Sequence, residues 1–215
     1  MLCVSIGEKR AEGCIAAMRG AELAEVRIDM LEKPAAGDVR AIFSSHKNLI
    51  ATCRPGALPD QKRKELLIAA LEAGAAYVDI EVESADEYKG EIAKKAKAMG
   101  RRVIVSYHDY ERTPTREELL HILEWCFDSG ADIAKIACMP RNDADNARLL
   151  GLLDGGKSVV VIGMGERGKI TRILAPLLGS PFTYVSTGRG KETAGGQIDM
   201  EAARKAMDAV REAVQ

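Results

Sequence analysis

The feature that most constrains the fold of this chain is an alternation of short apolar runs with longer amphipathic, charge-rich segments, which continues from end to end. Such alternation is typical of α/β proteins, in which helices join parallel strands. We predict strands at residues 2–6, 24–29, 48–53, 76–82, 102–107, 132–137, 158–163 and 182–186. We predict helices at residues 8–20, 38–45, 60–73, 86–99, 115–128, 142–153, 166–178 and 199–213.

Eight strand and helix units in 215 residues favour a closed barrel over an open sheet. A (β/α)8 barrel needs eight such units, whereas an open doubly wound sheet of this length more often has about five to seven strands. The connections are too short for a linker or a second core. The sequence therefore predicts a compact, single-domain (β/α)8 TIM barrel over residues 1–215.

Charge and cysteine usage indicate the class of partner and the compartment. With 31 basic and 32 acidic residues the net charge is -1, which disfavours nucleic acid or an anionic membrane as a partner and favours a small soluble ligand. The five cysteines are scattered and form no C-x-x-C pair, which argues against a disulfide framework and a zinc site. No signal-peptide pattern or long apolar run is present. We therefore expect a cytoplasmic protein that is neither secreted nor inserted in a membrane.

Charged and hydrogen-bonding residues recur at the C-terminal ends of five successive predicted strands. Residues two apart on a strand share a face, so each group points to one side of the sheet. One such charge is commonly solvated, but five strands in succession indicate the barrel rim on which active sites are built. The residues are Glu25, Arg27 and Asp29, then Thr52 and Arg54, Asp79 and Glu81, Ser106 and His108, and finally Lys135.

Lys135 is the most informative of these residues because it lies within the apolar run 131–140. A lysine is rarely buried unless a partner holds it. Its amine becomes nucleophilic when its pKa is lowered, either by removal from water or by a nearby cation, for which Arg54 and Arg172 are candidates. We predict that Lys135 forms a Schiff base and that His108, one strand away, moves protons beside it.

A glycine-rich stretch follows the seventh predicted strand. Residues 163–168 match G-x-G-x-x-G, and the P-loop pattern fails because Ile170 stands where Ser or Thr would bind magnesium. A dinucleotide site would have this motif in an opening βαβ unit, with an acidic residue about 20 positions later. Here the motif follows the seventh predicted strand, which argues against a dinucleotide site. We favour an anion site formed by the helix N-terminus and Arg172, with the loop 186–197 closing over the same rim.

In combination these motifs resemble the type I 3-dehydroquinate dehydratases, the Schiff-base family of the shikimate pathway. The resemblance runs from Glu25 to Gln197 and covers most of the chain. It rests on Glu-x-Arg at 25–27, Thr-x-Arg at 52–54, the segments 79–82 and 103–109 around the histidine, 131–137 around the lysine, 163–172, and Gly-Gly-Gln at 195–197.

The resemblance implies a reaction and a set of roles. Lys135 would form an imine with the C3 ketone of 3-dehydroquinate, and His108 would move protons between C2 and the departing C1 hydroxyl to give 3-dehydroshikimate. The substrate would be a small carboxylate, no metal or cofactor would be needed, and the protein would be a homodimer. The implied substrate-binding residues are Glu25, Arg27, Arg54, Arg172, Thr193, Gln197 and Ser5.

Two positions depart from the family pattern. Many members carry a glutamate four residues after the Thr-x-Arg arginine, where it pairs with the catalytic histidine, but this chain has Leu58 there. His108 is therefore expected to lack its usual carboxylate partner. Thr193 stands where a serine is usual, which preserves a hydroxyl.

Two other functions are compatible with parts of the sequence. A class I aldolase on the same type of barrel would also use Lys135, but would more often bind a phosphorylated sugar at the loops after the last two strands. A nucleotide-binding module built on residues 163–170 would be a different class of function from an enzyme. It would not explain the polar residues at the ends of five strands.

Overall fold

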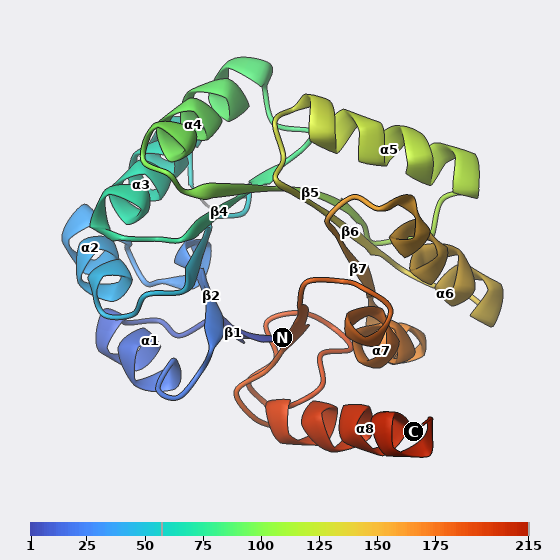
Figure 1. The fold of residues 1–215 in the computed structure, drawn as a ribbon. Helices are drawn as coiled ribbons and strands as arrows, with labels where there is room; N and C mark the ends of the chain where they lie inside the picture. Colours follow the sequence, from blue (N-terminus) through green and yellow to red (C-terminus); the bar gives the residue numbers. More distant parts are fainter. Residues whose placement is uncertain (57, 215) are drawn as a thin grey trace.

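The computed structural model describes residues 1–56 and 58–214, and it contains a ring of strands surrounded by helices (Figure 1). The predicted range 1–215 includes residues 57 and 215, which lie outside the described residues. The strands are β1 Leu2–Ile6, β2 Leu23–Arg27, β3 Leu49–Thr52, β4 Tyr77–Glu81, β5 Arg102–Asp109, β6 Ile133–Cys138, β7 Val159–Gly163 and β8 Thr183–Val185. The helices are α1 Ala11–Ala17, α2 Ala36–Ser44, α3 Asp60–Ala73, α4 Asp86–Ala98, α5 Arg116–Asp128, α6 Asp143–Leu150, α7 Gly165–Leu174 and α8 Met200–Ala213.

The strands form one parallel sheet in the order β7-β6-β5-β4-β3-β2-β1-β8. The two outer members, β7 and β8, contact each other and close the ring, although no hydrogen-bonded ladder joins them within the described residues. This arrangement confirms the predicted (β/α)8 barrel. No helix in the described part of the chain is long and apolar enough to cross a membrane.

Three predicted elements give way to 3-10 turns before their predicted ends. Strand β2 stops at Arg27, and Ile28–Met30 forms a 3-10 turn that takes Asp29 off the strand. The sixth helix ends at Leu150 and continues as the 3-10 turn Gly151–Gly155, before a left-handed glycine at 156. The seventh helix gives way to the 3-10 turn Ala175–Leu177 because Pro176 has no N–H with which to continue an α-helix.

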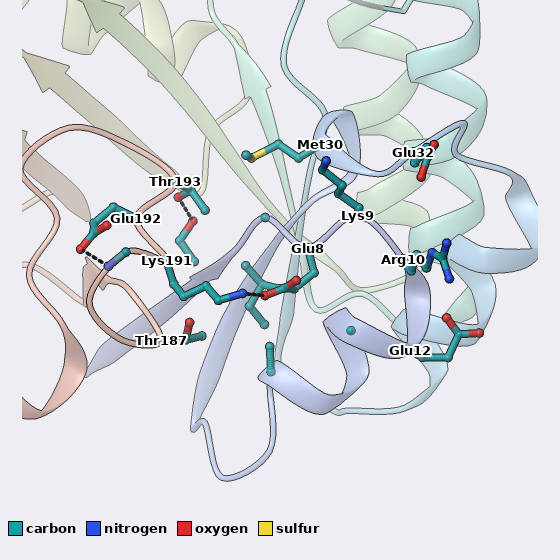
Figure 2. A pocket seen from close by; sticks show the side chains of 16 residues that line it. Glu8, Lys9, Arg10, Glu12, Met30, Glu32, Thr187, Lys191, Glu192 and Thr193 are labelled. Atoms are coloured by element: carbon teal, nitrogen blue, oxygen red, sulfur yellow. Dashed lines mark hydrogen bonds and ion pairs between the residues drawn. The ribbon is translucent and has the colours of Figure 1, made fainter.

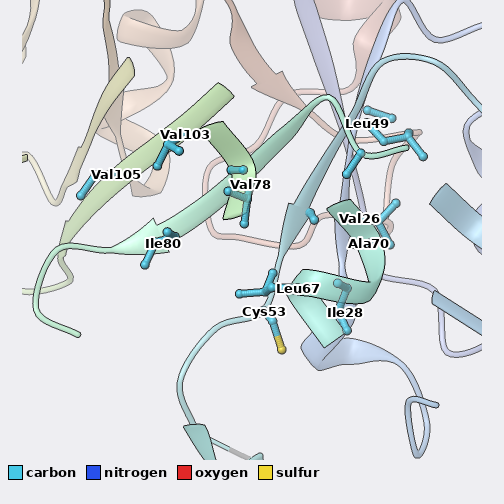
Figure 3. Packing of buried hydrophobic residues seen from close by; sticks show 14 of the residues in the cluster. Val26, Ile28, Leu49, Cys53, Leu67, Ala70, Val78, Ile80, Val103 and Val105 are labelled. Atoms are coloured by element: carbon cyan, nitrogen blue, oxygen red, sulfur yellow. The ribbon is translucent and has the colours of Figure 1, made fainter. Parts of the chain in front are cut away.

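The sheet has an apolar layer on its outer face. Aliphatic side chains of the strands pack there against the helices, and α3 supplies Leu67 and Ala70 to this layer. Figure 3 shows Val78 and Ile80 of β4 beside Val103 of β5 in the same layer. Because alternate residues of a strand face opposite ways, the intervening residues Asp79 and Glu81 point into the barrel.

The barrel interior is apolar toward one end and polar toward the other. Its apolar part is built from buried side chains that include Leu23, Ile50, Ile104, Ile133 and Phe182. The polar side chains occupy the end at which the strands finish. The fold therefore gathers the C-terminal residues of several strands around one small space.

Candidate active site

A cavity of about 230 Å3 lies at the C-terminal end of the barrel. Every substrate-binding or catalytic residue predicted from the sequence lines it, except Ser5. Ser5 lies just beneath, where its hydroxyl donates to the Glu25 carboxylate at 2.5 Å. The predicted residues on the cavity wall are Glu25, Arg27, Arg54, His108, Lys135, Arg172, Thr193 and Gln197.

Asp79 is the centre of a buried charge network beside this cavity. Its carboxylate accepts two hydrogen bonds from the Arg54 guanidinium, at 3.1 and 2.8 Å, and one from the Ser106 hydroxyl at 2.6 Å. The Lys135 ammonium donates to it at 2.9 Å. Burial by itself would raise the pKa of Asp79, but the charges of Arg54 and Lys135 outweigh burial and hold it well below its usual range.

The Lys135 ammonium is enclosed by acidic and aromatic groups. Besides Asp79, the Glu25 carboxylate lies 3.7 Å from Nζ, and the Tyr184 ring centroid lies 4.3 Å from it. Only 4% of the residue is exposed. Arg54, predicted as a cation beside the amine, is instead joined to it through the shared Asp79 carboxylate. Arg172 lines the same cavity.

Glu25 connects this network to the first and third strands. Its two carboxylate oxygens accept from Ser5 and from the Thr52 hydroxyl, the latter at 2.9 Å. Ser5 and Glu25 are register partners on β1 and β2, which places both side chains on the interior face. The predicted convergence of the polar rim therefore has a simple origin in the parallel register.

His108 has a carboxylate partner, although it is not the glutamate that the family usually carries at the position of Leu58. Its Nδ1 lies 3.0 Å from the Glu81 carboxylate of β4, and the other Glu81 oxygen accepts from Arg54 at 2.6 Å. Leu58, at the position where the family's glutamate is usual, packs partly buried against the apolar layer outside the sheet. A glutamate on a neighbouring strand therefore pairs with the histidine in this chain.

The surroundings of His108 keep its imidazole neutral near pH 7. Burial and the positive charge of Arg54 lower its pKa, and the hydrogen bond to Glu81 only partly offsets them. Burial tends to raise the pKa of Glu81, but Arg54 and His108 lower it overall. With Nδ1 donating to Glu81, the neutral ring leaves Nε2 unprotonated, which is the form of a general base.

Arg172 lies buried at the same cavity. Its Nη1 donates to the Tyr184 carbonyl at 3.2 Å, and its Nε has no hydrogen-bond partner within residues 1–56 and 58–214. Burial lowers the pKa of Arg172 to about 10, which leaves it charged at neutral pH. A buried cation with an unused donor is suited to bind an anionic group.

The glycines of residues 163–168 serve helix packing. A Cβ on Gly168 would lie 2.1 Å from the carbonyl carbon of Gly163, so glycine lets α7 approach the end of β7. Thr171 strengthens this contact, because its hydroxyl accepts from the Gly163 N–H at 2.7 Å. The N–H of Gly165 at the start of the helix donates to the Gly195 carbonyl at 3.2 Å. The motif thus explains how α7 and the loop over the rim fit together.

Residues 186–197, which we call the lid, lie closed over the cavity. The Thr193 hydroxyl is 2.7 Å from that of Ser5, and Arg27 donates to the Thr193 carbonyl at 3.5 Å. Gln197 contacts Thr193 within the lid through its Oε1, which accepts from the Thr193 N–H at 2.8 Å. On the outer side, Lys191 reaches Glu8 at 2.8 Å across a pocket of about 830 Å3 (Figure 2).

Three residues at the site have contacts that the sequence did not reveal. Tyr184 lies beneath Lys135, and Tyr110 stacks on His108 with ring centroids 5.9 Å apart. The Asp29 carboxylate accepts two hydrogen bonds from the Arg27 guanidinium, at 3.1 and 2.6 Å. It also accepts the backbone N–H of Arg54 at 3.0 Å. Parity along a strand identifies which face a residue occupies, but it carries no information about turns or aromatic contacts.

Comparison with known proteins assigns this geometry to a family. The family model described as type I 3-dehydroquinase matches residues 2–213. The chain belongs to the type I 3-dehydroquinase family. A 3-dehydroquinate dehydratase from Methanothermobacter thermautotrophicus is 41% identical over 216 residues, which cover 95% of this chain and 94% of the relative. One from Methanocaldococcus jannaschii is 35% identical and covers 94% of both chains.

Solved structures related to this type I 3-dehydroquinase family member share its barrel. The 3-dehydroquinate dehydratase from Geobacillus kaustophilus has a TM-score of 0.87 at 22% identity, covering 100% of this chain and 92% of that one. The one from Aquifex aeolicus has a TM-score of 0.83 at 26% identity, covering 97% and 98%. Both the resemblance inferred from the motifs and the barrel are therefore confirmed.

Proposed function

We propose that this protein dehydrates 3-dehydroquinate to 3-dehydroshikimate in the shikimate pathway, and that Lys135 carries the substrate as an imine. The observation that carries the proposal is a 4% exposed lysine in a polar cavity that also holds a neutral, carboxylate-paired histidine and a buried arginine. Family membership supplies the substrate and the net reaction.

In the first step Lys135 condenses with the C3 ketone. The ammonium gives up a proton and Nζ attacks the carbonyl carbon to form a carbinolamine. The carbinolamine hydroxyl then takes up one proton and leaves as water, which gives a protonated imine with no net change in the number of protons. Asp79, with its strongly lowered pKa, stays anionic and holds Nζ by the 2.9 Å contact. We assign Asp79 as the residue that positions the nucleophile.

In the second step His108 acts as base and then as acid. Its Nε2 takes a proton from C2, which is acidified because the protonated imine accepts the electron pair. The electrons return to expel the C1 hydroxyl, which leaves as water with the proton held by His108. Hydrolysis of the imine then releases the enone and restores Lys135, so the net change is loss of one water. No metal or organic cofactor is required by this route, since the imine serves as the electron sink.

The remaining predicted residues are proposed to bind the substrate. Arg172 and Gln197 bind the carboxylate, a role supported by Nε of Arg172, which has no hydrogen-bond partner in the described part of the chain. Glu25 and Arg54 bind ring hydroxyls. Arg27 and Ser5, which each contact Thr193 of the lid, hold the lid over the bound substrate.

The compartment and the assembly state are also proposals. Five free, buried cysteines support a reducing compartment, and we propose the cytoplasm. We propose a homodimer on the family resemblance, and analytical ultracentrifugation at micromolar concentration tests it by the mass of the species in solution.

The proposed activity is tested by steady-state assay of the purified protein with 3-dehydroquinate, following the ultraviolet absorbance of the conjugated product. We expect saturable turnover, and a fall of at least about 10^4-fold in Lys135→Ala because the covalent route is removed. Absence of turnover by the folded wild-type protein, or full activity of the alanine variant, would overturn the proposal.

A further inference from the structure

An aromatic side chain covers the imidazole of His108. The Tyr110 ring lies nearly parallel to the histidine ring, with an interplanar angle of 14° and centroids 5.9 Å apart. These values fall within the range of an offset aromatic stack. Tyr110 lines both the catalytic cavity and a second pocket, of about 440 Å3, and Arg54 and His108 line both of them as well. The tyrosine therefore stands between His108 and solvent.

The turn that carries Tyr110 is well anchored, although the residue itself is 67% exposed. Tyr110 directly follows the last residue of β5, Asp109, whose carboxylate accepts the N–H groups of Glu111 and Arg112, both at 2.9 Å. The Met139 N–H donates to the Asp109 carbonyl at 3.0 Å. This bonding fixes the backbone on which the ring is mounted, so the stack does not depend on a free loop.

We infer that Tyr110 is a positioning residue of the dehydratase reaction, whose ring holds the imidazole of His108 against Glu81 and shields it from water. The inference rests on the proposed role of His108 as acid and base. Glu81 fixes the ring through Nδ1 in the imidazole plane, whereas Tyr110 restricts tilting by covering a face. The two contacts together limit both rotation and tilt of the base.

Shielding by Tyr110 has a measurable consequence for the charge state of His108. The charged groups that face the imidazole are Glu81 from β4, Arg54 from the end of β3 and Lys135 from β6. None of these changes when Tyr110 is truncated, but burial, the largest cause of the lowered pKa, is reduced. The pKa of His108 then moves upward, toward about 6.5.

The test compares Tyr110→Ala with Tyr110→Phe, which keeps the stacked ring and loses only the hydroxyl. The pH dependence of kcat is measured from pH 5 to 8, and imine formation is measured separately by borohydride trapping. We expect Phe to remain within about twofold of wild type. We expect Ala to lower kcat about three- to tenfold and to move the acidic limb upward by about half a pH unit, with imine trapping unchanged.

Trp125→Ala is a matched control, because Trp125 is an exposed aromatic on α5 that does not line either cavity. It should leave the acidic limb in place. An unshifted limb in Tyr110→Ala would overturn the inference, as would a Phe variant as impaired as Ala. Loss of imine trapping in the wild-type protein would instead refute the proposed function, so the two failures are distinguishable.

Discussion

The outer and inner faces of the same strands are built from opposite chemistry. On β4, Val78 and Ile80 face the helices and are buried among aliphatic side chains, while Asp79 and Glu81 face the barrel interior and are bonded to cations. Residues next to each other in the chain thus serve different purposes. The outer face stabilises the barrel through apolar burial, and the inner face holds charges whose burial costs free energy unless each one is paired.

Substitutions on the outer face should therefore change mainly the free energy of unfolding, and substitutions on the inner face should change mainly the catalytic rate. A buried ion pair replaced by apolar residues can be neutral for stability, whereas removing one partner leaves the other charge unpaired. The interior network of Arg54, Asp79 and Lys135 is thus better explained by a catalytic task than by stability.

After the loss of Lys135, the largest effect on the inner face is expected from His108→Ala. The imine still forms, because Lys135 keeps its contact with Asp79, but removal of the proton from C2 loses its base. We expect kcat to fall about 10^2- to 10^4-fold. Steady-state kinetics combined with trapping of the imine measures both steps, and unchanged turnover would remove His108 from the mechanism.

Ile80→Ala sharpens the comparison, because Ile80 lies between the two acidic residues and faces the other way. The side chain is 2% exposed, and its truncation leaves a cavity in the outer layer. We expect a loss of about 2–5 kcal/mol in the free energy of unfolding, with kcat close to wild type for the folded fraction. Urea denaturation and kinetics below the midpoint measure the two quantities. A large loss of kcat with little loss of stability would contradict the separation of roles.

Glu81→Gln tests the carboxylate that pairs with His108. The amide keeps the shape but loses the charge-assisted hydrogen bonds to Nδ1 and Arg54. We expect kcat to fall about 10- to 100-fold, in line with about 1.5–3 kcal/mol for a hydrogen bond to a charged group.

Leu58→Glu in the Glu81→Gln background supplies a carboxylate at the position where the family usually has one. Partial recovery of kcat would support a carboxylate that orients His108 from either position. If Glu81→Gln alone kept wild-type kcat, Glu81 would have no part in orienting the histidine.

The smallest effect is the pH dependence of stability. The folded-state pKa of His108 is lowered, so the unfolded chain binds more protons below about pH 6.5 and stability falls as pH decreases through that range. The lowered pKa values of Asp79 and Glu81 add stability above about pH 4, which is lost only when the pH falls further, through their folded-state values. Urea unfolding at pH 7.5, 6.5 and 5.5 should show the first decline, and His108→Gln should make it shallower. An identical slope in that variant would contradict the assignment.

Much of the fold was predictable because the spacing of apolar and polar residues along the chain indicates which side of each strand they occupy. Acidic residues at alternate positions of β4 distinguished the outer face from the inner one, and the polar residues at five strand ends indicated the rim. The barrel register then brings Ser106 opposite Lys135, and Ser5 opposite Glu25, as strand parity requires.

The parts that the sequence did not predict depend on contacts between elements distant in the chain. The partner of His108 is 27 residues away on another strand, and motif comparison drew attention to Leu58 instead. The sequence does not distinguish Tyr184 from a core residue, because an aromatic residue in an apolar strand is typical of a core. The 3-10 turn at Ile28–Met30 also escaped prediction, since the apolar alternation continues through it.

The most direct test of the account is reduction of the wild-type protein with borohydride in the presence of 3-dehydroquinate, followed by intact mass and peptide mass analysis. The account predicts one substrate-derived adduct per chain, located on Lys135 and dependent on substrate. The absence of an adduct during active turnover, or an adduct on another lysine, would contradict the imine mechanism.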